Sequence, residues 1–217
     1  MTDQEILSRV DHTLLKAAAS WEEIKNLCDE AVRYKTASVC IPPVYVRPVL
    51  AEFGAGLVVC TVIGFPLGYS CTAAKALETE AALRDGASEI DMVINIGDVK
   101  NRRFNTVLGE IFLVKNICEN KIVKVIVETC YLTEEEKIRL CGIVTEAGAE
   151  FIKTSTGFGT SGAAIADVEL FARHIGPNVK IKAAGGIKTR EDMTAFIEAG
   201  AARLGTSSAV KILAGAL

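Results

Sequence analysis

The chain has 217 residues, of which half are hydrophobic, and its formal net charge is −3. This length suits one domain over residues 1–217 with a large core, while no apolar run approaches the roughly 20 residues of a membrane helix. The absence of a Lys/Arg cluster argues against nucleic acid as a partner, and the absence of a signal-peptide pattern at the N-terminus favours a cytoplasmic protein.

Short runs rich in Val and Ile alternate with helical patterns along the chain. These runs are mostly continuous in hydrophobicity, which is typical of strands covered on both faces. Val10–Thr13 completes the set as a short first strand, although its pattern alone does not identify it. The other predicted strands are Ser38–Ile41, Leu57–Ile63, Glu89–Asn95, Ile122–Glu128, Glu150–Thr154, Val179–Ala184 and Arg203–Ser207.

The helix boundaries carry their own signals. Ser20 with Glu23 and Thr133 with Glu136 predict capping boxes, and Thr189 with Asp192 is a weaker version. Glycine followed by alanine comes before three of the strands, which is typical of a left-handed residue after the last helical turn. These glycines are Gly86, Gly148 and Gly200.

Alternating strands and helices predict an α/β fold with a parallel sheet, here a single (β/α)₈ barrel. The alternative is a doubly wound open sheet. No strand is followed by the Gly-x-Gly-x-x-Gly pattern that such sheets use to bind dinucleotides, which argues against this alternative.

The seven cysteines include no Cys-x-x-Cys pair. Cys40, Cys60, Cys118 and Cys130 lie within or beside apolar runs, so we expect free core thiols in a reducing compartment. The two histidines are far apart in sequence, which gives little support to a metal-dependent mechanism. We therefore expect no metal and no cofactor.

Two lysines end strand-like runs and are followed by small residues. Lys153 lies in Phe-Ile-Lys-Thr-Ser-Thr-Gly-Phe (151–158), and Lys182 lies in Val-Lys-Ile-Lys-Ala-Ala-Gly-Gly (179–186). Two lysines at the ends of neighbouring strands repel, so one of them should lose its proton more easily. A neutral amine in a pocket is what Schiff-base catalysis requires.

In a barrel, polar residues toward the strand C-termini meet at the active-site mouth. We expect this of Asp11, Asp91, Lys124, Glu128, Lys153 and Lys182. Asp91 is the most informative acid, because its strand is otherwise too apolar to accept an unpaired carboxylate. For any single member, the alternative is a structural ion pair inside the barrel.

Small residues after the last strands predict a phosphate site, because the loops after strands seven and eight usually hold phosphate in this fold. Exposed backbone N–H groups would bind the phosphate. The alternative is that the glycines serve only to form tight turns, which also favour glycine. The residues are Gly185, Gly186, Gly205, Thr206, Ser207 and Ser208, with Thr156 and Gly157 as additions. The loop Gly64-Phe65-Pro66-Leu67-Gly68, followed by Lys75 and Glu78, is either a structural turn or part of the pocket mouth.

Eight of these motifs, in order and nearly end to end, resemble the deoxyribose-phosphate aldolases. They are Asp-His-Thr-Leu-Leu-Lys (11–16), Val-Cys-Ile (39–41), Gly-Phe-Pro-Leu-Gly (64–68), Glu-Ile-Asp-Met-Val-Ile-Asn-Ile-Gly (89–97), Lys-Val-Ile-Val-Glu-Thr (124–129), the lysine motif 151–158, Lys-Ala-Ala-Gly-Gly-Ile (182–187) and Gly-Thr-Ser-Ser (205–208).

The resemblance implies a metal-free class I aldolase on a (β/α)₈ barrel. Such enzymes interconvert 2-deoxy-D-ribose 5-phosphate with D-glyceraldehyde 3-phosphate and acetaldehyde, in deoxyribonucleotide catabolism. Lys153 resembles the Schiff-base lysine and Lys182 the second active-site lysine. Asp91 resembles the proton-relay aspartate, and Asp11 is similar to a supporting acid.

Three positions depart from the family pattern. Pro42 stands in place of an asparagine, Ala184 in place of a serine, and Ala209 in place of a glycine. The sequence ends at Ala216-Leu217, where some members carry an aromatic-bearing tail, so we expect no contribution from such a tail.

Two other functions remain open at this stage. One is another lysine-dependent barrel, such as a transaldolase-like enzyme with a hydroxyketone donor. The other is a sugar-phosphate-binding barrel without catalysis, against which the presence of Lys153, Lys182 and Asp91 together speaks. We expect small sugar phosphates and aldehydes as ligands, and a homo-oligomer, either a dimer or a tetramer.

Overall fold

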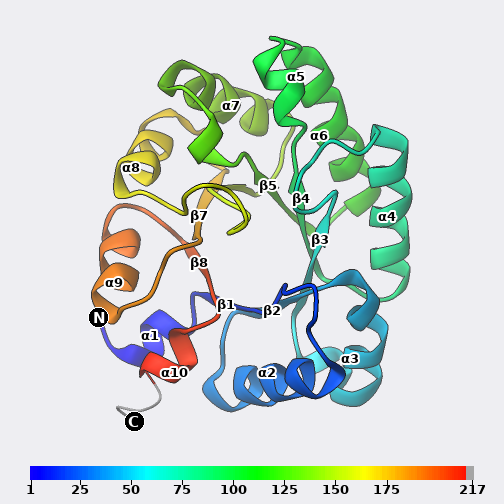
Figure 1. Cartoon of the computed structure of the whole chain (residues 1–217), viewed down its shortest axis with the longest axis vertical. Helices are drawn as coiled ribbons and strands as arrows, with labels where there is room; N and C mark the ends of the chain where they lie inside the picture. The colour runs from blue at the N-terminus through cyan, green and yellow to red at the C-terminus, as the bar shows by residue number, and fades with distance from the viewer. Residues whose placement is uncertain (214–217) are drawn as a thin grey trace.

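The computed structural model describes residues 1–213, which form a closed barrel of eight parallel strands surrounded by helices (Figure 1). The strands pair in chain order, and the last one closes on the first. Their bounds are β1 Val10–Thr13, β2 Ser38–Ile41, β3 Val59–Ile63, β4 Glu89–Val93, β5 Ile122–Ile126, β6 Phe151–Lys153, β7 Lys180–Ala184 and β8 Arg203–Thr206. The predicted barrel is confirmed. The alternative of an open sheet is excluded because β1 pairs with β8. The expectation about 216–217 falls outside the described residues.

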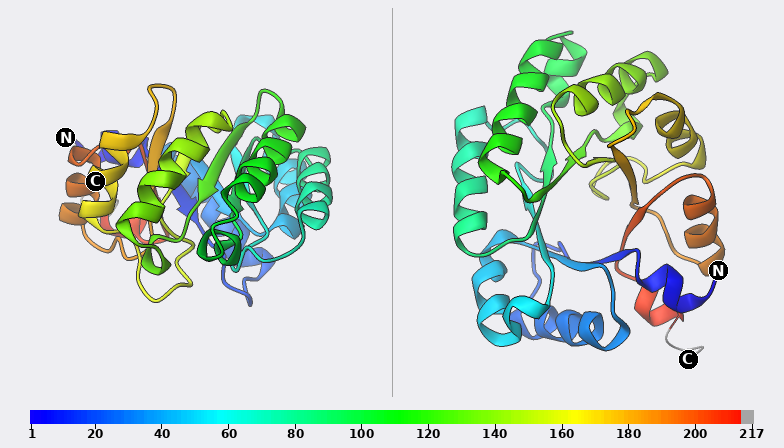
Figure 2. Two further views of the ribbon diagram at one scale, coloured as in Figure 1. Left: turned by 90° about the horizontal axis from the view of Figure 1, so that it is seen from above. Right: turned by 180° about the vertical axis from the view of Figure 1, so that it is seen from behind.

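Helices form the outer layer and α1 lies against α10 (Figures 1 and 2). No helix within residues 1–213 is long and apolar enough to cross a membrane. The helices are α1 Asp3–Leu7, α2 Trp21–Tyr34, α3 Val46–Phe53, α4 Thr72–Arg84, α5 Ile96–Lys100, α6 Phe104–Cys118, α7 Glu134–Glu146, α8 Ile165–His174, α9 Arg190–Glu198 and α10 Ala209–Leu213, with 3₁₀ turns η1 Pro43–Tyr45, η2 Gly54–Gly56 and η3 Thr129–Tyr131.

Several predicted strands are longer than the observed ones. Ile94 and Val127, which directly follow β4 and β5, are still buried and apolar, so hydrophobicity alone does not mark where the backbone leaves the sheet. Asn95 instead caps α5, with its side chain accepting from the Gly97 N–H. Glu128 adopts a left-handed backbone at φ 56° and leads into η3.

The predicted helix boundaries are confirmed. Ser20, Thr133 and Thr189 each form a complete capping box. A fourth box, Thr2 with Glu5, begins α1 and was not predicted. Beyond the ends of α4, α7 and α9, the glycines have φ values of 102° at Gly86, 73° at Gly148 and 116° at Gly200, as a left-handed position after a helix requires.

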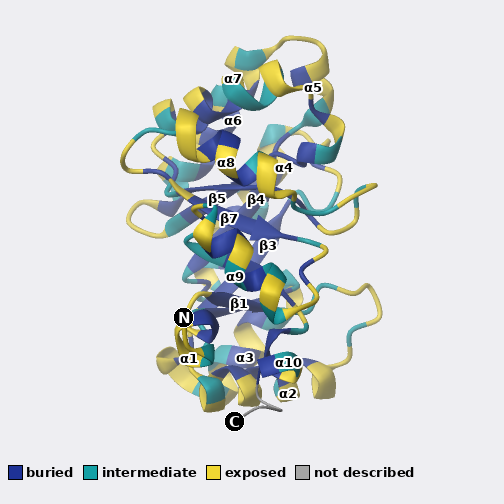
Figure 3. Cartoon of the chain, turned by 90° about the vertical axis from the view of Figure 1, so that its left-hand side faces the viewer, coloured by how far each residue is buried: buried dark blue, intermediate teal, exposed yellow. Residues whose placement is uncertain are grey.

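The apolar core lies between the strands and the helices, where Figure 3 shows the strands buried. Registered neighbours in a sheet point to the same face, and one face of this sheet brings charged residues together. Asp91 is registered with Lys124, Lys153 with Lys182, and Lys182 with Arg203. The barrel interior is therefore polar, and its outer wall is apolar.

The cysteines of the described residues are all free thiols. Cys40, Cys60 and Cys118 are buried, as predicted. The prediction of a core thiol was wrong for Cys130, which is half-buried because it lies in η3, where the chain has already left β5.

Candidate active site

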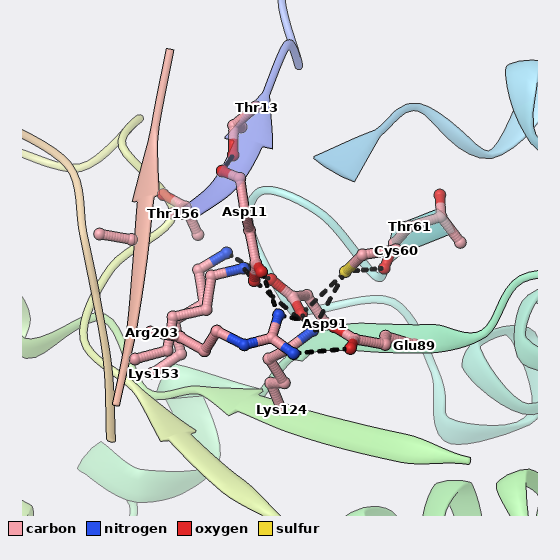
Figure 4. A network of polar contacts seen from close by, with 12 residues as sticks. Asp11, Thr13, Cys60, Thr61, Glu89, Asp91, Lys124, Lys153, Thr156 and Arg203 are labelled. Atoms are coloured by element: carbon pink, nitrogen blue, oxygen red, sulfur yellow. Dashed lines mark hydrogen bonds and ion pairs between the residues drawn. The ribbon is translucent and has the colours of Figure 1, made fainter. Parts of the chain in front are cut away.

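Seven ionisable side chains meet inside the barrel, and they come from six of its strands. Figure 4 shows this group around Asp91. Five of the seven were predicted to converge at the mouth of the barrel. The other two, Glu89 and Arg203, were not predicted. The seven are Asp11, Glu89, Asp91, Lys124, Lys153, Lys182 and Arg203.

Asp91 lies at the centre of this group and is fully buried. Its Oδ2 accepts from the Nζ atoms of Lys153 and Lys182, each at 2.7 Å. Its Oδ1 accepts from Lys124 Nζ at 2.8 Å and from the Cys60 thiol at 3.1 Å. Burial opposes the charge of Asp91, but the three lysines outweigh burial and hold the pKa of this carboxyl well below its usual range.

Lys182 and Lys124 are each held between two carboxylates. Lys182 Nζ lies 2.5 Å from Asp11 and 2.7 Å from Asp91. Lys124 Nζ lies 2.6 Å from Glu89 and 2.8 Å from Asp91. Burial opposes both ammonium groups, but the carboxylates outweigh it and raise the pKa of Lys182 and of Lys124 above the ordinary value. Both lysines therefore keep their protons at neutral pH.

Arg203 connects Asp11 and Glu89, the two acids of the group that do not contact Lys153. Its guanidinium pairs with Asp11 and donates to Glu89 Oε1 at 3.0 Å. Sequence reasoning missed Arg203 and Glu89 as site residues. The signal was the period of two, since Glu89 precedes Asp91 by two residues and therefore points to the same face.

Of the seven groups, Lys153 lines an open cavity of about 450 Å³ at the C-terminal end of the barrel. Its side chain pairs with Asp91 alone among the carboxylates of the described residues. A cavity of about 490 Å³ also lies outside the barrel, beside α5 and α7. There, Lys100 and Glu136 pair with each other at 2.7 Å on the surface, so we place the site at Lys153.

The predicted phosphate loops line the same cavity as Lys153. Gly185 and Gly186 have φ values of 82° and 77°, a left-handed backbone that favours glycine. A side chain at Gly162 would lie 2.3 Å from the Gly185 backbone, so the two loops pack closely. The loop after β7 thus turns its backbone toward the cavity.

The expected backbone donors are not all available. Within residues 1–213, the N–H groups of Gly185, Gly186 and Ser207 have no acceptor, whereas the Ser208 N–H donates to Thr206 Oγ1 at 3.2 Å. Sequence reasoning missed two cations beside this cradle, Lys16 and Lys188, which line the cavity. Lys16 ends the motif 11–16 and Lys188 directly follows the motif 182–187. Neither lies in a strand, and charged site residues were expected only at strand ends.

Glu128 does not join the lysine cluster, although it was predicted to converge there. It accepts from the Thr156 N–H at 3.1 Å and from the Thr156 hydroxyl, and so holds the loop after β6. The backbone donor of Thr156 is thereby occupied, while Gly157 lines the cavity without such a contact. Glu128 thus supports the cavity wall.

The loop at Gly64–Gly68 contributes to both expected roles. Phe65 packs edge-on against Phe158, which lines the cavity, with ring centroids 5.4 Å apart. The Gly64 N–H donates to Glu78 at 2.7 Å. Lys75 pairs with Glu110 at 2.6 Å and donates to the Val93 carbonyl, which holds α4 against the end of β4.

One of the three departures from the family pattern lines the pocket. Ala184 lines the cavity, and Ala209 is buried at the start of α10. Pro42 precedes the 3₁₀ turn η1.

One group of possible metal ligands lies near Lys153. In the described part of the chain, the donor atoms of Cys40, Cys60 and Asp91 lie within 4.8 Å of one another. Asp91 is already bound by three lysines, and the positive charge of the protonated Lys124 and Lys182 repels a cation. The donor set therefore fits a metal poorly.

Comparisons with known proteins agree with this architecture. The model of the DeoC/LacD family aldolases matches residues 3–216. A deoxyribose-phosphate aldolase of Clostridium botulinum (strain Eklund 17B / Type B) is 60% identical over 99% of this chain and 97% of its own length. That of Clostridioides difficile (strain 630) is 55% identical over 97% and 96%, respectively.

Solved structures are similar over nearly the whole barrel. A structure described as a putative deoxyribose-phosphate aldolase from Coccidioides immitis has a TM-score of 0.95 and 38% identity, covering 100% of this chain and 87% of that one. The deoxyribose phosphate aldolase from Aeropyrum pernix, described as tetrameric, has a TM-score of 0.89 and 34% identity, covering 99% and 92%. With the family model matching almost every residue, this chain belongs to the DeoC/LacD family of aldolases.

Proposed function

We propose that this protein cleaves 2-deoxy-D-ribose 5-phosphate reversibly to D-glyceraldehyde 3-phosphate and acetaldehyde, through a Schiff base on Lys153. The observation that carries the proposal is the position of Lys153. Lys153 lines the cavity, and its amine contacts Asp91, which also binds Lys182. A nucleophile, a relay acid and a protonated lysine are thus adjacent. Relatives that are 55–60% identical over nearly their whole length carry the same activity in their names.

The first half of the reaction forms the covalent intermediate. The neutral amine of Lys153 attacks the C1 aldehyde carbon of the open-chain sugar and gives a carbinolamine. Lys182 supplies the proton with which the C1 hydroxyl leaves as water, and the Asp91 carboxylate relays this proton, so that an iminium remains. Lys182 suits this step because its pKa is raised and it keeps a proton to give.

The second half breaks the carbon–carbon bond. When a base removes the proton of the C3 hydroxyl, the electrons of the C2–C3 bond move into the iminium. Glyceraldehyde 3-phosphate leaves and the enamine of acetaldehyde stays on Lys153. Protonation of the enamine at C2 and hydrolysis of the resulting iminium then release acetaldehyde and the free amine.

The phosphate of the substrate is bound by the loops after β7 and β8. The unoccupied N–H groups of Gly185, Gly186 and Ser207 provide donors, with Gly157 nearby. Lys16 and Lys188 line the same cavity and provide positive charge. A phosphate there, with the aldehyde carbon at Lys153, matches the two ends of the proposed substrate.

A transaldolase-like reaction would use the same lysine chemistry with a different donor, and a non-catalytic barrel would use none. We expect acetaldehyde with glyceraldehyde 3-phosphate to give deoxyribose 5-phosphate, as measured by product chromatography and mass spectrometry. Dihydroxyacetone offered in place of acetaldehyde should give no product. Turnover only with the hydroxyketone would support the transaldolase-like alternative, and turnover with neither donor would support the binding protein.

Three further expectations remain predictions: a single domain over residues 1–217, a cytoplasmic location and a homo-oligomeric state. The tetrameric Aeropyrum pernix relative supports the last of these. Exposed apolar side chains on the adjacent helices α4 and α6, Leu77 and Phe112, also favour contact with another copy.

A further inference from the structure

The buried charges of the barrel interior form a closed ring, here called the ion-pair ring. Its members alternate in sign, and each contacts the next. The order is Asp91, Lys182, Asp11, Arg203, Glu89, Lys124 and back to Asp91. Three carboxylates therefore alternate with three cations drawn from β1, β4, β5, β7 and β8.

Lys153 stands outside this ring. The three cations of the ring balance its three carboxylates, so an ammonium group at Lys153 would be a fourth cation with no carboxylate of its own among the described residues. It contacts Asp91 Oδ2, the same oxygen that Lys182 binds. No carboxylate of the ring is therefore left over to balance a charge on Lys153, and the form of a lysine that attacks a carbonyl is the neutral amine.

We propose that Glu89 and Arg203 are positioning residues that keep the ion-pair ring neutral, and that they thereby set the pH range in which Lys153 reacts. This inference rests on the proposed function of Lys153 as the nucleophile. Arg203 pairs with Asp11 and Glu89, and Glu89 pairs with Lys124. The two residues thus act on Lys153 through their neighbours and touch no substrate.

Other charged or titratable groups also face Lys153 or its cavity. They are Cys40 on β2, Cys60 on β3, Asp91 on β4, Lys124 on β5, Glu128 after β5, Lys182 on β7, and Lys16 and Lys188 in loops. Burial and the neighbouring Cys40 thiol raise the pKa of Cys60 well above its usual value, so Cys60 remains a thiol. None of these groups changes in variants of Glu89 or Arg203. A shift in such variants therefore reports the ion-pair ring.

The test is the pH dependence of kcat/KM in four variants. Glu89→Gln removes a negative charge, so the ammonium form of Lys153 becomes less favourable. We expect the acid limb to move down by about one pH unit. Arg203→Gln removes a positive charge and should move the acid limb up by a similar amount. Arg203→Lys keeps the charge and should leave the limb near its wild-type position.

The double variant Glu89→Gln/Arg203→Gln restores equal numbers of opposite charges in the ring. Its acid limb should return to within a few tenths of a unit of the wild type, even if its activity is lower. Limbs that stay in place in both single variants, or that move in the same direction, would overturn the proposal. A double variant that does not return toward the wild type would overturn it as well.

Folding is checked by circular dichroism on every variant. If the single variants do not fold, a folded double variant with the wild-type limb supports the ring, and a double variant that also fails to fold overturns it. The pH dependence of Lys153 acylation by acetic anhydride, mapped by mass spectrometry, reports the same amine without turnover. A wild type that lacks aldolase activity would therefore refute the proposed function, while the acylation midpoints still decide the role of the ring.

Discussion

At the scale of single residues, the site depends on the ion pairs and hydrogen bonds that compensate the buried charge of Asp91. A fully buried carboxylate is costly unless it is paired and hydrogen-bonded. Both oxygens of Asp91 are occupied, by three lysine side chains and a thiol. The same contacts that make this burial tolerable place a protonated lysine beside Lys153. Stability and the proposed chemistry therefore rest on one group.

Replacing Asp91 by asparagine should destabilise the fold in a pH-dependent way. At pH 7 we expect the free energy of unfolding to fall by about 3–5 kcal/mol, because the lysines lose their shared counter-charge. The pKa of Asp91 is depressed in the folded state, so its stabilisation is present above the unfolded value of about 3.9 and is lost as the pH falls through the folded value. The gap between wild type and variant should therefore narrow below pH ~4.

Urea denaturation of both proteins, at pH values about one unit apart between pH 3 and pH 8, measures this difference in the free energy of unfolding. Asp29→Asn on the surface of α2, where Asp29 lies 3.9 Å from Lys25, is the matched control and should change little at any pH. A variant as stable as the wild type at pH 7, or a gap that widens toward acid, would contradict the account of Asp91.

The sequence predicted some of these residues and not others, for a physical reason. Lys153, Lys182 and Asp91 interrupt apolar runs, and a charge in a buried strand requires an explanation. Glu89 and Arg203 begin their strands, where a charge is ordinarily solvated and attracts no attention. Closure of the barrel brings these two starting residues together, and no local pattern reports that closure.

At the scale of elements, the loops after β6, β7 and β8 build the cavity wall around Lys153. Their positions could be predicted because the C-terminal ends of parallel strands share one end of a barrel. Their internal contacts could not. The bond from the Ser208 N–H to Thr206, and the contacts of Thr156 with Glu128, depend on side-chain orientations that a one-dimensional pattern does not contain.

A negative charge in the loop after β8 should distinguish the phosphate from the sugar. We expect Ser208→Asp to raise KM for deoxyribose 5-phosphate by about tenfold or more through repulsion, and KM for free deoxyribose much less. Steady-state kinetics with both substrates measures the ratio. Ser8→Asp, which adds the same charge at the exposed end of α1, should leave both values unchanged. Equal losses with the two substrates would place the phosphate elsewhere.

At the scale of the whole molecule, the closed barrel converts distance along the chain into proximity. Asp11 and Arg203 are 192 residues apart in sequence and form an ion pair. The alternation of strands and helices predicted this architecture, because each parallel strand needs a covering crossover. The first strand was the weakest part of that prediction, since β1 has four residues and includes both Asp11 and His12.

The central claim is that Lys153 carries the covalent intermediate, and borohydride reduction tests it most directly. The protein is treated with limiting acetaldehyde and sodium borohydride, digested and mapped by mass spectrometry, with Lys153→Met as the matched control. We expect an ethyl group on Lys153 at near-stoichiometric yield, and no ethyl group at this site in the variant. Stoichiometric labelling of Lys182 or Lys124 in place of Lys153, or an active enzyme that is not labelled at all, would contradict it.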